Sequence, residues 1–154
     1  MKSDDDLRRE VEQQLEAEPS IDARRIVVSV SDGIVTLGGE VRSYAEKWQA
    51  ERTVERVPAV RGLANEIEVR SDTAHSDSEI ARMAIESLKW NVLVPSSSVT
   101  VRVENGWIFL TGEVSWEFQR RAAERALRNL PGIRGITNLV SVKPRVGAGD
   151  VDSR

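Results

Sequence analysis

The chain is built from one sequence pattern that is used twice. Shifting the second half by 73 residues lays it on the first half without a gap, so that Gly106 falls on Gly33. A fixed internal period indicates that one structural unit occurs more than once. We therefore predict two domains, at residues 1–70 and 77–143, joined by a small polar linker at 71–76.

The first part of each repeat predicts a helix followed by a strand. Apolar residues four apart mark one face of a helix, and the aspartate before each helix, Asp4 or Asp77, is expected to cap its free backbone N–H groups. Alternating apolar and polar residues then predict a strand with one buried face. The helix positions are Leu7, Val11 and Leu15, then Ile80, Ala84 and Leu88; the strand positions are Ile26, Val28 and Val30, then Val99, Val101 and Val103.

The hairpin turns are the strongest local signal in the chain. Asp32-Gly33 and Asn105-Gly106 are residue pairs that type I′ turns favour, because both central residues of such a turn need a positive φ. Returning strands are then expected at residues 34–41 and 107–114.

A second helix and a third strand complete each repeat. Ser43 with Glu46 three residues later is a capping-box pattern, and the second repeat is expected to begin this helix near Ser115. Pro58 and Pro131 mark where these helices end. The order αββαβ predicts an α+β fold in which a three-stranded sheet carries both helices on one face. The shared apolar helix positions are Ala50, Val54 and Val57, then Ala123, Leu127 and Leu130; the third strands are expected at 63–69 and 136–142.

These motifs resemble the BON domain, a family named after bacterial osmotically inducible and nodulation proteins. The resemblance rests on the run through the turn Asp/Asn-Gly and on the later run Pro-x-x-Arg-Gly-x-x-Asn, and it covers nearly the whole chain. It implies the αββαβ fold and a role in binding phospholipid membranes or other envelope interfaces, often under osmotic stress. A link to potassium binding in one relative implies an alternative role as an ion sensor. The matching segments are 28–41 with 58–69, and 101–114 with 131–142.

Composition argues against catalysis. The chain has no cysteine, and its one histidine, His75, lies in the polar linker, so neither a histidine-based triad nor a zinc site has its parts. Gly38-Gly39 and Gly112 do not match a phosphate-binding loop, and we interpret them as glycines at strand bends or bulges. We predict a binding module without enzymatic activity, cofactor or metal.

Charge and hydropathy restrict the partner and the location. Residues 1–69 carry 10 basic and 15 acidic side chains, and residues 76–143 carry 9 and 7, which is too weak a positive balance for a nucleic-acid surface. No apolar run approaches the roughly 20 residues of a membrane-spanning helix. The polar, acidic start of the chain predicts a cytoplasmic protein. The polar tail at 144–154 suggests the hypothesis that a third unit begins there.

Aromatic side chains are the first candidates for a binding surface. Trp107 and Phe109 alternate with the buried positions of their strand, so they are expected on the sheet face that the helices leave open. An exposed pair of large aromatic side chains is expected to be buried by a contact with another surface. It either packs against the other unit or a second copy, which would make the chain a self-association module, or binds a partner or lipid. Trp90, beyond Leu88, either closes the end of a core or anchors the helix in a membrane interface.

Basic residues on the second helix of the second repeat are the other candidates. Arg121, Arg125 and Arg128 share one stripe away from the core face. The stripe is either a solvated face or a site for phosphate headgroups. Trp48, which takes the place of Arg121 in the first repeat, is expected to point outward. The leading hypothesis is thus an adaptor that binds a protein partner or an anionic phospholipid surface.

Overall fold

The computed structural model describes residues 2–71 and 75–143, so the tail at 144–154 and its hypothetical third unit lie outside the described residues. The chain divides into two compact units, residues 1–73 and 74–154. The first unit contains α1 (Asp4–Ala17), a short 3₁₀ turn η1 (Ala23–Arg25), β1 (Ile26–Ser31), β2 (Ile34–Val41), α2 (Tyr44–Glu55), β3 (Gly62–Asn65) and β4 (Glu68–Val69). The second contains α3 (Asp77–Trp90), η2 (Ser96–Ser98), β5 (Val99–Glu104), β6 (Trp107–Val114), α4 (Glu117–Leu127), β7 (Gly135–Asn138) and β8 (Ser141–Val142).

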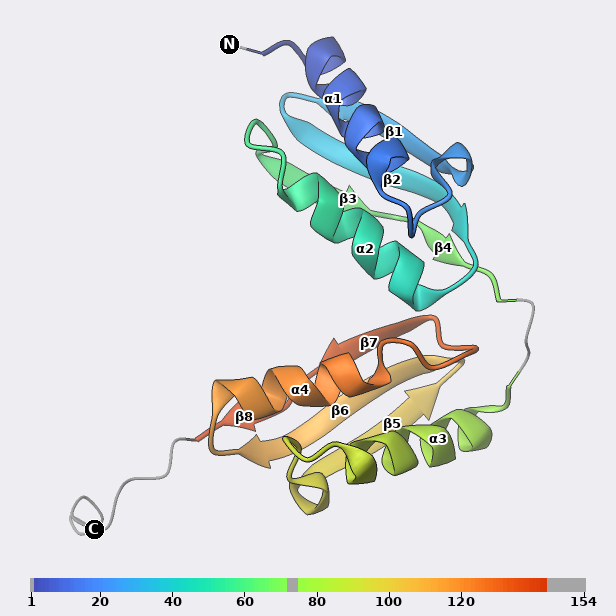
Figure 1. The fold of residues 1–154 in the computed structure, drawn as a ribbon, viewed down its shortest axis with the longest axis vertical. Coiled ribbons are helices and arrows are strands. Elements are labelled where there is room, and N and C mark those ends of the chain that lie inside the picture. The colour runs from blue at the N-terminus through green and yellow to red at the C-terminus, as the bar shows by residue number, and fades with distance from the viewer. Residues whose placement is uncertain (1, 72–74, 144–154) are drawn as a thin grey trace, which may run out of the picture. The chain divides into compact units, whose positions relative to one another are not determined.

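Each unit is one small sheet with both helices on the same face (Figure 1). In the first unit β1 pairs antiparallel with β2, and β3 and β4 pair parallel with β2, so β2 is central and β1 is an edge. The second unit repeats this pairing with β5, β6, β7 and β8. The α+β prediction of two tandem αββαβ units is confirmed.

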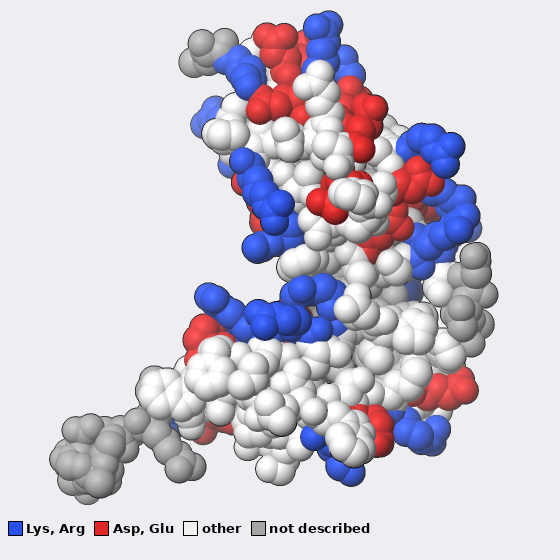
Figure 2. Space-filling view, viewed as in Figure 1, with Lys and Arg blue, Asp and Glu red and all other residues white. Residues whose placement is uncertain are grey.

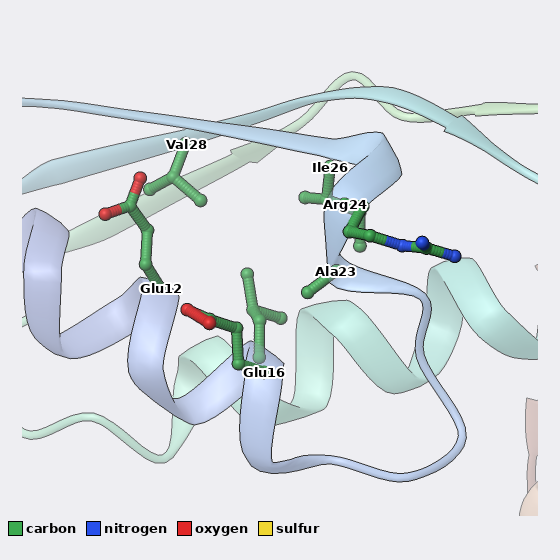
Figure 3. Close-up of a pocket in the computed structure, with 7 residues that line it drawn as sticks. Glu12, Glu16, Ala23, Arg24, Ile26 and Val28 are labelled. Atoms are coloured by element: carbon green, nitrogen blue, oxygen red, sulfur yellow. The ribbon is translucent and has the colours of Figure 1, made fainter.

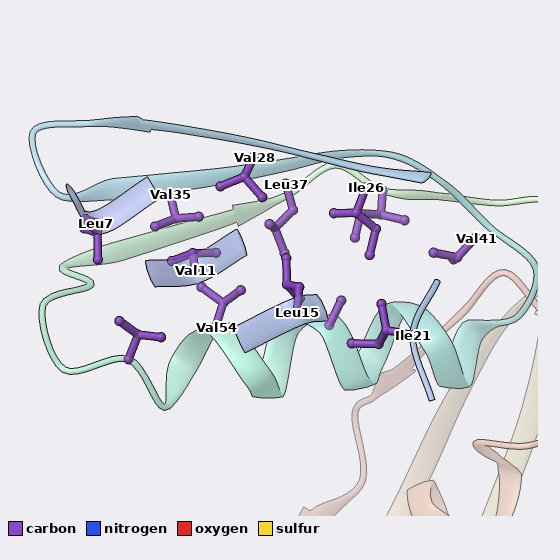
Figure 4. Close-up of a cluster of buried hydrophobic side chains, with 13 residues drawn as sticks. Leu7, Val11, Leu15, Ile21, Ile26, Val28, Val35, Leu37, Val41 and Val54 are labelled. Carbon is purple, nitrogen blue, oxygen red and sulfur yellow. The ribbon is translucent and has the colours of Figure 1, made fainter. Parts of the chain in front are cut away.

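The core of each unit lies between its sheet and its two helices. Figure 4 shows this core in the first unit, where side chains from α1, α2 and the sheet meet. Leu7, Val11 and Leu15 are buried as the helical period predicts, and so are Ile80, Ala84 and Leu88. Core positions recur at the offset of 73 residues. Of the buried apolar residues of the first unit, Val28 and Val57 have half-buried counterparts, Val101 and Leu130.

The hairpin turns have the expected backbone conformation, but the aspartates at the helix starts do not cap their helices. Asp32 and Asn105 have φ of 53° and 48°, and the glycine after each has φ of 80°, as a type I′ turn requires. The N-caps of α1 and α3 are Ser3 and Ser76. The prediction that Asp4 and Asp77 cap their own helices is wrong, because serine occupies the N-cap position and the carboxylates reach the hairpin instead.

Each of these carboxylates binds both backbone N–H groups of a hairpin turn. Asp77 accepts hydrogen bonds from the N–H groups of Asn105 and Gly106, both at 2.9 Å. Asp4 accepts from Asp32 at 2.9 Å and from Gly33 at 3.1 Å. The contact ties the first turn of the helix to the tip of the hairpin in both units.

Replacing Asp4 by alanine is expected to destabilise the first unit by about 1–2 kcal/mol. Hydrogen bonds to a charged acceptor contribute roughly 1.5–3 kcal/mol when buried, and exposure to water reduces that value here. Urea denaturation monitored by circular dichroism would measure the change, with Asp6→Ala as control, since Asp6 shares the helix start in the first unit. The turn contact would be unimportant if Asp4→Ala and Asp6→Ala cost the same.

The third strand of each unit is interrupted, which corrects the prediction of continuous strands at 63–69 and 136–142. The gap between β3 and β4 lies opposite Gly38-Gly39 of β2, where Gly39 has φ of 100°. These two glycines stay paired with β1, so only the parallel pairing is interrupted. The side chain of Asn65 bridges the gap, because its oxygen accepts the N–H of Ile67 at 3.2 Å. Asn138 does the same for Val140 at 3.1 Å.

The second helices begin at slightly different caps. Ser43 is the N-cap of α2 as predicted, and its hydroxyl accepts the N–H of Glu46. The carboxylate of Glu46 does not complete a capping box, since it accepts from the N–H groups of Arg42 and Asp22. In the second unit the N-cap is Trp116, not Ser115, and the helix begins at Glu117.

Candidate functional site

Large apolar side chains are exposed mainly on the second unit. Of nine such side chains among the described residues, seven belong to it. Five of them lie on or beside two neighbouring loops: Trp90 (79% exposed), Val92 (96%), Leu93 (47%), Trp116 (52%) and Phe118 (53%). We call these five residues the apolar end.

The topology of the unit brings these residues to one end of it. The helix α3 ends at Trp90 and leads into β5, and β6 ends at Val114 and leads into α4. Because β5 and β6 are antiparallel, with Val99 opposite Gly112, both connections lie at the same end of the sheet. A hollow of about 680 Å³ at this end is lined by residues of both loops, among them Pro95 and Trp116.

The first unit carries no such residues at the equivalent positions, although its fold is the same. The offset of 73 residues places Ala17 at the position of Trp90 and Ser20 at that of Leu93. Fold stability therefore does not require the apolar end, and a soluble surface gains nothing from exposing it. The remaining counterparts are Pro19 for Val92, Ser43 for Trp116 and Ala45 for Phe118.

Charged groups lie beside the apolar end, and most of them are paired with one another. The indole N–H of Trp90 donates to the Glu86 carboxylate at 3.1 Å, one turn back in α3. Near α4, Lys143 pairs with Glu113 at 3.5 Å, and the Arg121 guanidinium donates to Glu117 at 3.1 Å. Figure 2 shows a broad uncharged area over the α3–α4 face of the second unit, with basic side chains gathered along α4.

Trp90 is exposed as part of the apolar end. The interpretation that it closes the end of a core is therefore wrong. With 79% of its surface exposed it does not close the end of a core. The reason is that Leu88 already fills the last buried position of α3, and Trp90 points to another side of the helix. The interfacial interpretation stays a prediction.

Trp107 and Phe109 alternate with buried neighbours on β6, and their own sheet partly covers them. Both are half-buried, while Ile108 between them is buried. The Trp107 ring lies over Gly135 of β7, and its indole N–H donates to the Thr137 hydroxyl at 2.8 Å. The guanidinium carbon of Arg102 stands 4.1 Å from the centroid of the Phe109 ring. Self-association or ligand binding through this pair stays a prediction.

The predicted basic stripe on α4 is shorter than the sequence pattern indicates. Arg121 and Arg125 are exposed, but Arg128, the C-cap of α4, is half-buried. Trp48 is also half-buried rather than fully exposed. The guanidinium of Arg52, one turn further along α2, lies 5.3 Å from its ring centroid.

Sequence analysis selected only Trp90 from the apolar end. Val92, Leu93, Trp116 and Phe118 fall at helix ends and in loops, where no periodic pattern marks them. A signal was present in the repeat itself: at each position the second copy has a large apolar residue and the first has a small or polar residue or proline.

Among residues 2–71 and 75–143, no group of three or more histidine, aspartate or glutamate side chains is placed to hold a metal ion. In the same part of the chain, no helix is both long and apolar enough to cross a bilayer.

A comparison with known protein families identifies the repeated unit. A family model described as the BON domain matches residues 3–71 and 76–144. Osmotically-inducible protein Y of Escherichia coli (strain K12) is 25% identical over 135 residues, which are 80% of this chain and 65% of that protein. The chain thus spans less than two thirds of the length of this relative.

Solved structures of CdsD, described as a structural protein of the type III secretion system of Chlamydia trachomatis, are also similar. One, of its C-terminal domain, is 20% identical, with a TM-score of 0.39, over 92% of this chain and 68% of that one. Another is 19% identical, with a TM-score of 0.41, over 98% and 68%.

Proposed function

Because this chain belongs to the BON domain family in both of its units, we propose that it is a non-enzymatic binding protein whose second unit docks on a phospholipid surface. The docking surface is the apolar end. The single observation that supports this proposal is the difference between two units of one fold: only the second exposes two tryptophans, a phenylalanine and two aliphatic side chains at this end.

The chemistry of the apolar end suits the interface of a bilayer. Tryptophan is enriched at the level of lipid headgroups, where an apolar ring and a polar N–H are both accommodated. Burying apolar surface contributes about 25 cal/mol per Å², so five partly exposed side chains support reversible attachment and not permanent insertion. Trp116 and Phe118 flank Glu117, the first residue of α4, and Trp90 ends α3, so loops and helix ends would enter the headgroup layer.

Exposed arginines add a preference for anionic lipid. Arg121 and Arg125 lie one and two turns into α4 from its first residue, Glu117. A basic residue near an anionic bilayer contributes on the order of 1 kcal/mol. The pairing of Arg121 with Glu117 reduces that contribution, so we expect the charge effect to be secondary to the apolar one.

Vesicle co-sedimentation of the full chain tests both the apolar contribution and the contribution of the arginines. We expect binding to neutral phosphatidylcholine vesicles, strengthened severalfold by added phosphatidylglycerol and weakened by salt. Arg121→Gln with Arg125→Gln should remove most of the gain from anionic lipid and leave binding to neutral vesicles unchanged. Trp90→Ala should weaken binding to both vesicle types. Val27→Thr, which replaces an apolar side chain of the first unit that is 65% exposed, should have no effect.

A lack of sedimentation with either vesicle type would contradict the proposal and leave a protein partner as the occupant of the apolar end. We also extend to this chain the osmotic context that the name of its E. coli relative carries. Its cellular level is then expected to rise when the osmolarity of the medium is raised, which immunoblotting would measure.

A further inference from the structure

The first unit has an open sheet edge with an unusual composition. Strand β1 is paired on one side only, with β2, and its six residues Ile-Val-Val-Ser-Val-Ser contain neither a charge nor a proline. Proteins usually protect an edge strand with lysine, proline or a bulge, because an unprotected edge pairs with other strands. The equivalent strand β5 carries Arg102 and Glu104. The edge of β1 therefore lacks the usual protection.

The register of the hairpin shows which backbone groups face outward. Next to the two-residue turn, Ser31 and Ile34 form a hydrogen-bonded pair, and such pairs alternate along an antiparallel ladder. Ser29 and Val27 therefore also bond to β2. The N–H and C=O groups of Val28 and Val30 point away from it, toward the free edge, where an added strand would bind them.

A hollow lies directly beside this edge, between α1 and β1 (Figure 3). Its volume is about 530 Å³, and its apolar walls come from Leu15, Ala23, Ile26 and Val28. Side chains of a strand added to β1 would alternate, and every second one would face this hollow. The edge would form backbone hydrogen bonds with an added strand, and the hollow would select which side chains that strand can carry.

The rim of the hollow is acidic. In Figure 3, the side chains of Glu12 and Glu16 extend from α1, whereas the Arg24 side chain points away from them. Arg24 donates to Asp22 at 3.1 Å, and this hydrogen bond lowers the pKa of Asp22 from its ordinary value. Glu12 pairs with Arg8 at 2.9 Å. Among the described residues no cation lies within ion-pair distance of Glu16, so its charge is available to an incoming group.

We propose that β1 of the first unit binds an extended segment of a protein partner, added as an edge strand, with lysine or arginine at the positions that face α1. The aliphatic stem of such a residue lies on Leu15 and Val28, and its cation reaches Glu16. A second copy of this chain fits less well, because antiparallel pairing of two β1 strands about their centres sets Glu12 against Glu12. The chain then joins a protein through one unit and a surface through the other.

A peptide titration tests this assignment on the full chain. The probe is the acetylated, amidated heptapeptide TKVKTKV, and the matched control is TEVETEV. Backbone ¹⁵N NMR spectra should show saturable shifts for Val28 and Val30 with the lysine peptide, with affinity at least tenfold above that for the glutamate peptide. Shifts confined to β5, or equal affinity for the two peptides, would overturn the proposal.

The second unit provides the matched variant. It has Ile85 and Lys89 where the first has Glu12 and Glu16, so Glu12→Ile with Glu16→Lys replaces residues by ones that this fold already carries. We expect this double variant to bind the glutamate peptide more tightly than the lysine peptide. The milder Glu16→Gln should lower the affinity for the lysine peptide severalfold. An unchanged preference in the folded Glu16→Gln protein, or a dimer of the free chain that pairs through β1, would also overturn the assignment.

Discussion

Replacing Gly39 by alanine is expected to unfold the first unit, and Gly112→Ala the second. These glycines have φ of 100° and 126°, which residues with a side chain rarely adopt. A Cβ atom at Gly39 would also stand against the carbonyl oxygen of Arg25, far inside van der Waals contact, and one at Gly112 would meet the carbonyl of Ser98. Strain and overlap together cost more than about 3 kcal/mol, and a unit of this size has only about 3–5 kcal/mol of stability.

The neighbouring Gly38 is the control for this prediction. It has no positive φ, and apart from its two chain neighbours no residue has an atom within 4 Å of the place where its Cβ would stand. Gly38→Ala should therefore change the free energy of unfolding by less than about 1 kcal/mol. Urea denaturation of the three variants would measure the difference, and a Gly39→Ala protein as stable as Gly38→Ala would contradict the role assigned to the positive φ of Gly39 in β2.

Transplanting first-unit residues into the apolar end is expected to weaken vesicle binding at least tenfold while the fold is kept. The variant combines Trp90→Ala, Leu93→Ser, Trp116→Ser and Phe118→Ala, each residue being the one that the first unit carries at the equivalent position. Tenfold corresponds to about 1.4 kcal/mol, less than the transfer of four large apolar side chains provides. The fold should persist because these side chains are exposed and the first unit folds without them.

Introducing the second-unit residues into the first unit provides a further test of this prediction. Adding Ala17→Trp, Ser20→Leu, Ser43→Trp and Ala45→Phe to that variant moves four of the five side chains of the apolar end to the first unit. Vesicle binding should return, since the same side chains then occupy the same end of the same fold. Unimpaired binding of the first variant, with native-like circular dichroism, would show that lipid contacts another surface.

Much of the fold was predictable because its signals are local. Asp32-Gly33 and Asn105-Gly106 specify their turns by the positive φ that those residues tolerate, and the strands that follow have the predicted bounds 34–41 and 107–114. The helical period placed Leu7, Val11 and Leu15 in the core for the same reason: the spacing of neighbours in sequence decides which face they share.

The contacts that the sequence did not predict join residues far apart in the chain. Asp4 binds a turn 28 residues away, and the break between β3 and β4 lies opposite Gly39, which has a positive φ in another strand. Among the candidate residues, Arg121 is exposed as expected and Trp90 is exposed instead of closing a core, whereas Trp116 and Phe118 were not selected. Their importance depends on which loops meet at the end of the sheet.

The amino-acid sequence by itself determined the repeated unit, its strand and helix order, and the family to which the chain belongs, because periodicity, turn residues and the 73-residue offset are properties of sequence neighbours. Only the tertiary structure decided which apolar side chains stay exposed and where they meet. Exposure depends on what packs above a side chain, and packing joins segments whose distance in space no local pattern encodes.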